Sequence, residues 1–176
     1  NKNVGQFIYK HFSLGLNCEH EDYLLCIEWF IKKNKIDFII PLSEPELRFF
    51  SKKNIHKVGT AQIISASSKA QKIGFDKLKT ATFLKENKFP YPKTSSLNEE
   101  GYKFKYPLIL KSRHGSGSSK VHLIKNKESL NYFKKLYKNF IKKEYIDDIE
   151  GEYTCCVFRS SKKELRSIIF KRVLYG

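Results

Sequence analysis

A basic loop rich in glycine and serine is the part of the sequence best suited to chemistry. Residues 109–125 read ILKSRHGSGSSKVHLIK, with two glycines and four serines between two apolar runs. Small residues let successive backbone N–H groups turn toward one anion, and Lys111 ends the first run with a compact positive charge. The pattern predicts a phosphate-binding loop, although the loop alone is equally typical of a flexible surface hairpin that binds nothing.

The flanks of this loop decide which kind of phosphate loop it would be. The Walker formula is absent, and the stretch Gly115–Lys120 lacks the third glycine of the dinucleotide fingerprint. Both of those motifs run from a strand into a helix, so that the anion meets the helix N-terminus. Here the apolar runs Pro107–Lys111 and Val121–Ile124 both predict strands. We therefore expect a hairpin flap that closes over a phosphate chain.

Composition limits the alternatives. The formal net charge is +16, from 34 Lys and Arg against 18 Asp and Glu, and 14% of the residues are aromatic. The aromatic content favours a folded globular protein, and the scattered lysine doublets favour a solvated surface. A basic nucleic-acid-binding module stays as the alternative. No apolar run reaches the roughly eighteen residues of a membrane span, and no secretory signal begins the chain, so we expect a cytoplasmic protein.

The cysteines and histidines do not predict a metal site. Cys18 and Cys26 lie near His11 and His20, but their spacing matches no standard zinc pattern, and no C-x-x-C occurs. The adjacent pair Cys155-Cys156 lies in a strand-like run, where neighbours face opposite sides. We expect reduced thiols with no metal.

The first third of the chain predicts part of a doubly wound α/β unit. Tyr23–Lys33 has apolar residues at helical spacing, and Ile36–Ile40 is a short apolar run typical of a parallel strand buried on both faces. Ser43 and Glu46 then form a capping-box pattern for a helix to about Lys53. We expect residues 1–66 to form an α/β domain truncated at its N-terminus, because the chain begins at Asn1 and contains no methionine.

The rest of the chain predicts a mixed α+β region. The apolar run Gln62–Ser65 leads into Ser67 and Ser68, either of which can cap a helix, and two close prolines follow a second helix, Asp76–Asn87, which ends before Phe89. The further elements that we expect are one helix and three strands, with a hairpin turn at Ser160–Lys163: Ser129–Tyr137, Phe140–Ile146, Glu152–Phe158 and Leu165–Leu174.

Four pieces in this order resemble the ATP-grasp family, most closely its carbamoyl-phosphate-synthase-like branch. They are FDKLKTATFLKENKFPYPKT at 75–94, PLILKSRHGSGSSKV at 107–121, IKKEYIDDIEGEYTCCV at 141–157, and upstream IDFIIPLSEPEL at 36–47. The last piece looks like the end of the α/β domain that precedes the grasp. The resemblance implies that residues 67–176 are the N-terminal portion of an ATP-grasp domain, with a nucleotide-clamping flap lobe at about 104–143.

The same resemblance implies an ATP site. Lys77 and Lys111 match the two basic residues that contact the phosphates, and the second also touches the adenine edge. Gly115, Ser116, Gly117 and Ser118 match the flap over the phosphates, and Glu144, Tyr145 and Ile146 match the hinge strand that reads adenine. Glu152 matches the acid that binds the ribose hydroxyls, and Arg172 matches a possible phosphate or substrate contact. Cations suit phosphates and an acceptor suits hydroxyls. His114 within the loop is expected to be solvated.

The implied reaction is phosphorylation of a carboxylate by ATP and capture of the acyl phosphate by an amine or another nucleophile. Catalysis then depends on positioning and charge stabilisation, and the resemblance points to no catalytic residue. In the family, acids and an asparagine on late strands hold Mg²⁺, but this sequence has no Asp, Glu or Asn after Glu164. We therefore expect the metal-binding lobe to be missing and Mg²⁺ only in a complete domain. A non-catalytic scaffold of the same fold is the further alternative.

Overall fold

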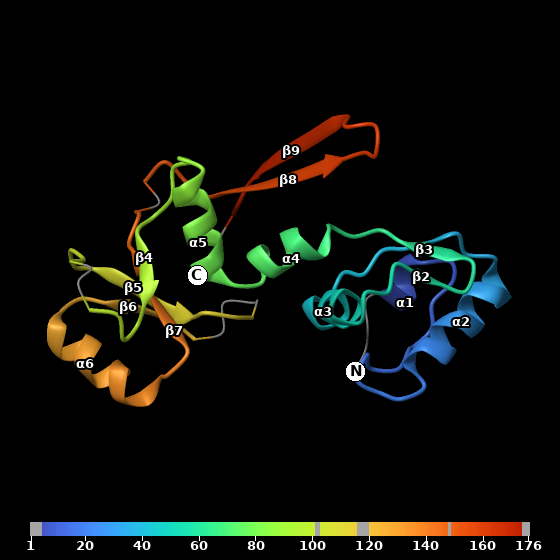
Figure 1. Cartoon of the computed structure of the whole chain (residues 1–176), viewed down its shortest axis with the longest axis horizontal. Helices are drawn as coiled ribbons and strands as arrows, with labels where there is room; N and C mark the ends of the chain where they lie inside the picture. Colours follow the sequence, from blue (N-terminus) through green and yellow to red (C-terminus); the bar gives the residue numbers. More distant parts are fainter. Residues whose placement is uncertain (1–4, 101–102, 116–119, 148, 174–176) are drawn as a thin grey trace.

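The structure is a computed structural model that describes residues 5–100, 103–115, 120–147 and 149–173. Figure 1 shows a small α/β unit at one end and a four-stranded sheet at the other, with two consecutive helices running between them. These connecting helices are α4 (Ser68–Gly74) and α5 (Lys77–Glu86). None of the described helices has the length and apolar composition needed to cross a membrane.

The N-terminal unit packs two of its three helices, α2 (Tyr23–Asn34) and α3 (Glu44–Lys53), on a three-stranded sheet. Its other elements are α1 (Gly5–Ile8), β1 (Phe38–Ile39), β2 (Lys57–Val58) and β3 (Ala61–Ile63). The strand order is β1-β3-β2, with β1 parallel and β2 antiparallel to β3. Tyr23, Ile31, Phe50 and Ala61 lie in its core.

The start of α3 is confirmed, and its cap has a specific geometry. The hydroxyl of Ser43 accepts a hydrogen bond from the N–H of Glu46 at 3.3 Å and donates to the carboxylate of Glu46 at 2.7 Å. The same carboxylate accepts a hydrogen bond from the hydroxyl of Tyr23 at 2.7 Å. The capping pair therefore also links α3 to α2.

The prediction of a strand buried on both faces at Ile36–Ile40 was wrong. The strand is parallel to β3, as expected, but it is only two residues long and is an edge strand in the described part of the chain. Phe38 is 59% exposed and Ile40 is 65% exposed. The run is apolar, but burial on both faces requires elements on both sides of a sheet.

The second unit is an antiparallel sheet with the strand order β4-β7-β5-β6. Its elements are β4 (Thr94–Ser96), β5 (Leu108–Ser112), β6 (Val121–Ile124), α6 (Lys127–Leu136) and β7 (Phe140–Glu144). The basic loop runs from β5 into β6, which confirms that it connects two strands. One sheet face carries Leu108 and Leu110, which are packed in a core with Leu130 and Phe133 of α6.

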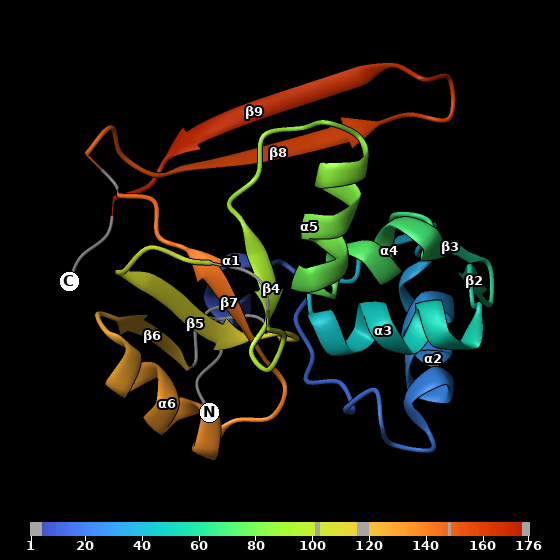
Figure 2. The same ribbon diagram turned by 60° about the vertical axis from the view of Figure 1, so that its left-hand side comes forward.

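A long hairpin ends the described chain. It consists of β8 (Tyr153–Arg159) and β9 (Leu165–Lys171), which pair from Tyr153↔Lys171 to Arg159↔Leu165. The turn is closed by a hydrogen bond from the N–H of Lys163 to the carbonyl of Ser160 at 3.0 Å, as predicted. Every residue of both strands is exposed, and Figure 2 shows the hairpin extending away from the four-stranded sheet.

Candidate functional site

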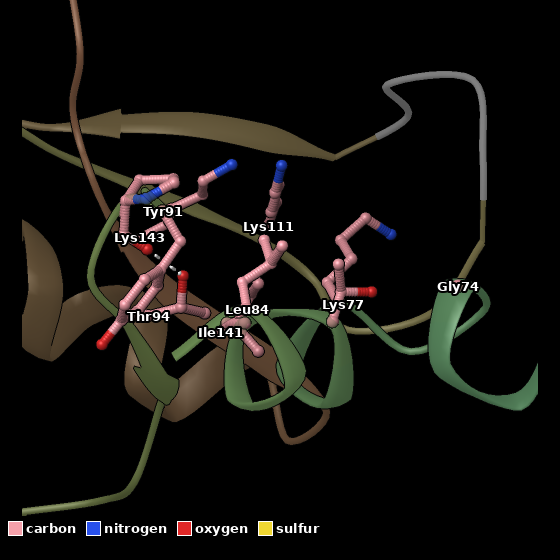
Figure 3. A pocket seen from close by; sticks show the side chains of 11 residues that line it. Gly74, Lys77, Leu84, Tyr91, Thr94, Lys111, Ile141 and Lys143 are labelled. Carbon is pink, nitrogen blue, oxygen red and sulfur yellow. Dashed lines mark hydrogen bonds between the residues drawn. The ribbon is translucent and has the colours of Figure 1, made fainter. Parts of the chain in front are cut away.

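A cavity of about 270 Å³ lies between α5 and the sheet face that does not pack on α6. Strand alternation assigns residues to this face, because Lys111 pairs with Ile141 and Ile109 pairs with Lys143 across β5 and β7. The lining comes from α4, α5, the segment before β4, and the strands β4, β5 and β7: Gly74, Lys77, Thr80, Ala81, Leu84, Tyr91, Pro92, Thr94, Lys111, Ile141 and Lys143. Figure 3 shows this lining from close by.

Three lysines dominate the chemistry of this cavity. Lys77 is the first residue of α5, Lys111 lies on β5, and Lys143 lies on the central strand β7. The described residues that line the cavity include no Asp or Glu. Figure 3 shows Lys111 between the other two, with the amine of Lys77 turned aside from those of Lys111 and Lys143. A concave site with cations and no acid favours an anionic ligand.

The surroundings of Lys111 oppose its positive charge. Burial, followed by the like charges of Lys143 and Lys77, lowers the pKa of Lys111 to about 8. Burial also lowers the pKa of Lys143, and the nearby positive charge of Lys77 lowers it further. Because an entering anion stabilises the charged form of an amine, a phosphate in this cavity would raise the pKa of Lys111 again.

A buried carboxylate connects α5 to the base of the loop. Asp76 caps α5 by accepting hydrogen bonds from the N–H groups of Leu78 at 3.0 Å and Lys79 at 3.3 Å. It also accepts a bidentate pair from Arg113, at 2.8 Å from Nε and 2.7 Å from Nη2. Although burial opposes ionisation, these partners lower the pKa of Asp76 to about 2. His114 lies 3.5 Å from the same carboxylate.

Lys77 is held at the entrance to the loop. Its N–H donates to the carbonyl of Arg113 at 3.1 Å, and its ammonium donates to the carbonyl of Gly115 at 2.7 Å. Gly115 has φ +89°, a left-handed conformation that favours glycine. The structure therefore brings Lys77, Lys111 and Gly115 together. Ser116, Gly117 and Ser118 lie outside the described residues, and their role in a flap stays a prediction.

The three residues expected to read adenine do not line the cavity that holds the lysines. Glu144 faces away from the cavity. It pairs with Leu108 of β5, and because paired residues share a sheet face, its side chain lies on the face that packs on α6. Its carboxylate accepts a hydrogen bond from the N–H of Lys93 at 3.0 Å. Tyr145 and Ile146 follow β7, and they are 40% and 66% exposed. None of the three lines the cavity, so their assignment to adenine gains no support from this geometry.

Glu152 and Arg172 bind each other at the open end of the β8–β9 hairpin. Arg172 Nη1 lies 2.7 Å from the carboxylate of Glu152, and the N–H of Arg172 donates to the carbonyl of Glu152 at 2.8 Å. Both side chains are exposed, and neither lines the cavity. Sequence reasoning had given these two residues separate ligand roles, which the structure does not test.

Sequence reasoning missed Lys143, although a signal was present. In a strand that begins at Phe140, Ile141 and Lys143 share one face and Lys142 lies on the other. Lys142 is only 5% exposed, and its ammonium donates to the carbonyl of Glu99 at 2.8 Å. Two consecutive lysines therefore have different environments, and only Lys143 lines the cavity.

No metal site is found in the part of the chain that the structure describes. Among these residues, no three His, Cys, Asp or Glu side chains come together in a way that could hold an ion. The four cysteines are free thiols; Cys18 is buried, and Cys155 and Cys156 are exposed on the hairpin.

Comparison with known proteins identifies the family. The family model of the ATP-grasp domain matches residues 75–174, more than half of the chain. The chain belongs to the ATP-grasp family. No curated protein matches it in sequence. The match contains α5, β5, β6, β7 and the terminal hairpin. The Glu152–Arg172 pair and all residues that line the cavity with the three lysines (the lysine cavity), except Gly74, therefore lie within this ATP-grasp region.

Solved structures show the same fold. N5-carboxyaminoimidazole ribonucleotide synthetase from Thermus thermophilus superposes with a TM-score of 0.65 at 16% identity, over 92% of this chain and 43% of that one. The N5-carboxyaminoimidazole synthetase from Staphylococcus aureus has a TM-score of 0.66 at 19% identity, over 97% of this chain and 45% of that one. Biotin carboxylase from Campylobacter jejuni, solved as a complex with beta-gamma-ATP, has a TM-score of 0.60 at 18% identity, over 85% of this chain and 38% of that one. The chain spans less than half the length of each of these three proteins.

Proposed function

We propose that this chain binds the triphosphate of ATP in the lysine cavity and is the nucleotide-binding portion of an ATP-grasp ligase. The observation that carries the proposal is a partly buried cavity with three lysines and no carboxylate among its described lining residues. Polyphosphate is the biological anion that best matches several ammonium groups in one cavity. The solved complex of a similar biotin carboxylase with beta-gamma-ATP supports the choice of nucleotide.

The complete enzyme would activate a carboxylate. A carboxylate oxygen attacks the γ-phosphorus of ATP, ADP leaves, and the acyl phosphate is then attacked by an amine, which releases phosphate. In this scheme Lys77 and Lys111 hold and neutralise the phosphates, and the loop after Gly115 covers them. Mg²⁺ would add to this charge neutralisation in a complete domain, although the described residues form no cluster of three or more His, Cys, Asp or Glu side chains that could hold it.

The proposal extends to organisation and location. Residues 67–176 would be the N-terminal portion of the ATP-grasp domain, after an α/β domain at 1–66. The carboxylate and the amine would bind elsewhere in the complete protein. Cytoplasm is the compartment that supplies ATP and keeps free thiols such as Cys155 reduced, so we place the activity there.

Titration of the chain with a fluorescent ATP analogue tests this function. We expect saturable binding that unlabelled ATP reverses, and Lys111→Met should weaken it about tenfold because it removes a charge-assisted phosphate contact. Lys79→Met is the matched control, since Lys79 is an exposed lysine of the same helix as Lys77 and lies outside the cavity. Displacement by any polynucleotide, with no preference for ATP, would support a basic nucleic-acid-binding module instead.

A further inference from the structure

Lys143 occupies the position in the cavity that is hardest to explain without a ligand. It lies on the central strand β7, opposite Thr94 on one neighbouring strand and Ile109 on the other. Lys143 lines the same cavity as Lys111, and its positive charge is one of the causes that lower the pKa of Lys111. Placing two like charges together in a partly buried site costs stability, so the arrangement calls for a compensating group.

The described surroundings of the two amines provide no such group. The nearest acid in sequence, Glu144, lies on the opposite face and accepts a hydrogen bond from Lys93. The hydroxyl of Thr94 donates to the carbonyl of Pro92 at 2.8 Å, and that of Thr80 donates to the carbonyl of Ile73 at 2.9 Å. The remaining described lining residues are apolar, apart from Gly74, Lys77 and Tyr91.

We propose that Lys143 is a third phosphate-binding residue, which together with Lys111 holds one phosphate group of the nucleotide. This inference rests on the proposed function of the cavity. Lys77 is bound to the loop at Gly115, whereas Lys143 lies on the far side of Lys111 in Figure 3. Lys77 therefore contacts the outer part of the phosphate chain, and the Lys111–Lys143 pair contacts the phosphate next to the ribose.

The proposal has a proton-linked consequence. The other titratable groups that line the cavity are Lys77 from α5 and Tyr91 from the segment before β4, and no carboxylate is among the described lining residues. Burial and the neighbouring lysines lower the pKa of Lys111 to about 8, so part of this amine is neutral at that pH. A phosphate that bridges the two amines stabilises both charges, and its binding at pH 8 takes up protons.

Calorimetry with adenosine, AMP, ADP and ATP tests the placement. We expect Lys143→Met to weaken the binding of AMP, ADP and ATP by a similar factor, about tenfold, because each of them carries the innermost phosphate. Adenosine should bind Lys143→Met and the wild type equally. Lys77→Met should weaken ATP and ADP but leave AMP almost unchanged, and Lys79→Met should change nothing.

The outcomes separate this inference from the proposed function. A wild-type chain that binds no adenine nucleotide contradicts the function itself. If the wild type binds ATP and Lys111→Met weakens it, but Lys143→Met binds like the wild type, the inference alone is wrong. An equal loss for adenosine would show that Lys143 reads the base, which also overturns the inference.

A measurement on the wild type protects the test against a variant that does not fold. AMP binding at pH 8, measured in two buffers of different ionisation enthalpy, should show net proton uptake, and the uptake should vanish well below the pKa of Lys111. Binding with no proton uptake at pH 8 would contradict a phosphate shared between the two amines.

Discussion

The four-stranded sheet and the β8–β9 hairpin are both antiparallel, yet only the sheet has a core. Leu108, Leu110 and Ile124 of the sheet are no more than 1% exposed, whereas Ile169 and Phe170 of the hairpin are 65% and 51% exposed. Backbone pairing is regular in both. The difference shows that strand pairing sets register, while packing on a second layer fixes where side chains point.

The same difference applies to the candidate site. Lys111 and Lys143 project from strands that are held by the core beneath them. Glu152 and Arg172 lie on the hairpin, where an exposed ion pair of 2.7 Å joins them. The proposed anion site therefore lies on a packed scaffold, whereas the two hairpin residues do not line its cavity. Four predictions test this contrast.

Removing core volume should affect the sheet far more than the hairpin. Leu110→Ala empties space at a position that is 0% exposed, and it should lower the free energy of unfolding by about 2–5 kcal/mol. Ile169→Ala, on the hairpin, should change it by less than roughly 0.5 kcal/mol. Urea unfolding followed by circular dichroism measures both. Equal losses would show that the hairpin has a packed core of its own.

Asp76→Asn should have the next largest effect, because it breaks the buried connection between α5 and the loop. The pKa of Asp76 is about 2 in the folded chain, against an ordinary 3.8, which corresponds to about 2 kcal/mol of stabilisation. A lowered carboxyl pKa stabilises the fold above the unfolded value, and the benefit disappears as the pH falls from about 4 to 2.

Unfolding of the wild type and Asp76→Asn at several pH values checks this prediction. The difference in unfolding free energy between the wild type and the variant should reach its full value at pH 6 and should shrink as the pH falls toward 2. A difference that did not depend on pH would mean that the loss came from packing and not from the carboxylate.

Lys111→Met should stabilise the chain while it weakens nucleotide binding. The lowered pKa of Lys111 means that folding disfavours its charge, so the wild type gains stability as the pH rises from about 8 toward 10.5. Removing the amine should raise the unfolding free energy at pH 7 by roughly 1 kcal/mol. Thermal unfolding without nucleotide measures this change, and a destabilised variant would contradict a site held ready for an anion.

Glu152→Gln should have the smallest effect on stability. The pair with Arg172 is about half exposed on each side, and exposed pairs contribute about 0–1 kcal/mol. A double-mutant cycle with Arg172→Gln should give a coupling energy below roughly 1 kcal/mol. A larger coupling would show that the open end of the hairpin is more rigid than its exposure indicates.

Locally encoded elements were predictable from the sequence. The cap at Ser43 fixed the start of α3 because its partners lie within three residues, and the loop between β5 and β6 was recognisable from its flanking apolar runs. Four spaced motifs predicted the family, which the family model confirms. In each case the determining contacts are close in sequence or form a repeated pattern.

The remaining features depend on contacts between distant segments. β4 consists of Thr94, Ser95 and Ser96, a polar run that is a strand because it pairs with β7. Exposure of Phe38 depends on what covers β1, which the apolar run itself does not specify. The face of Glu144 and the proximity of Lys143 to Lys111 follow from the register of β7 against β5, which is a tertiary property.

The adjacent lysines of β7 make the length of the preceding chain critical. Lys142 extends into the layer beneath the sheet, where its ammonium lies 5.7 Å from the ring centroid of Phe104, and Lys143 faces the opposite way. A single-codon deletion just upstream of β7 would exchange the two sides, sending Glu144 toward the cavity and Lys143 into the apolar layer. Insertions and deletions of one residue should therefore be far less tolerated here than substitutions.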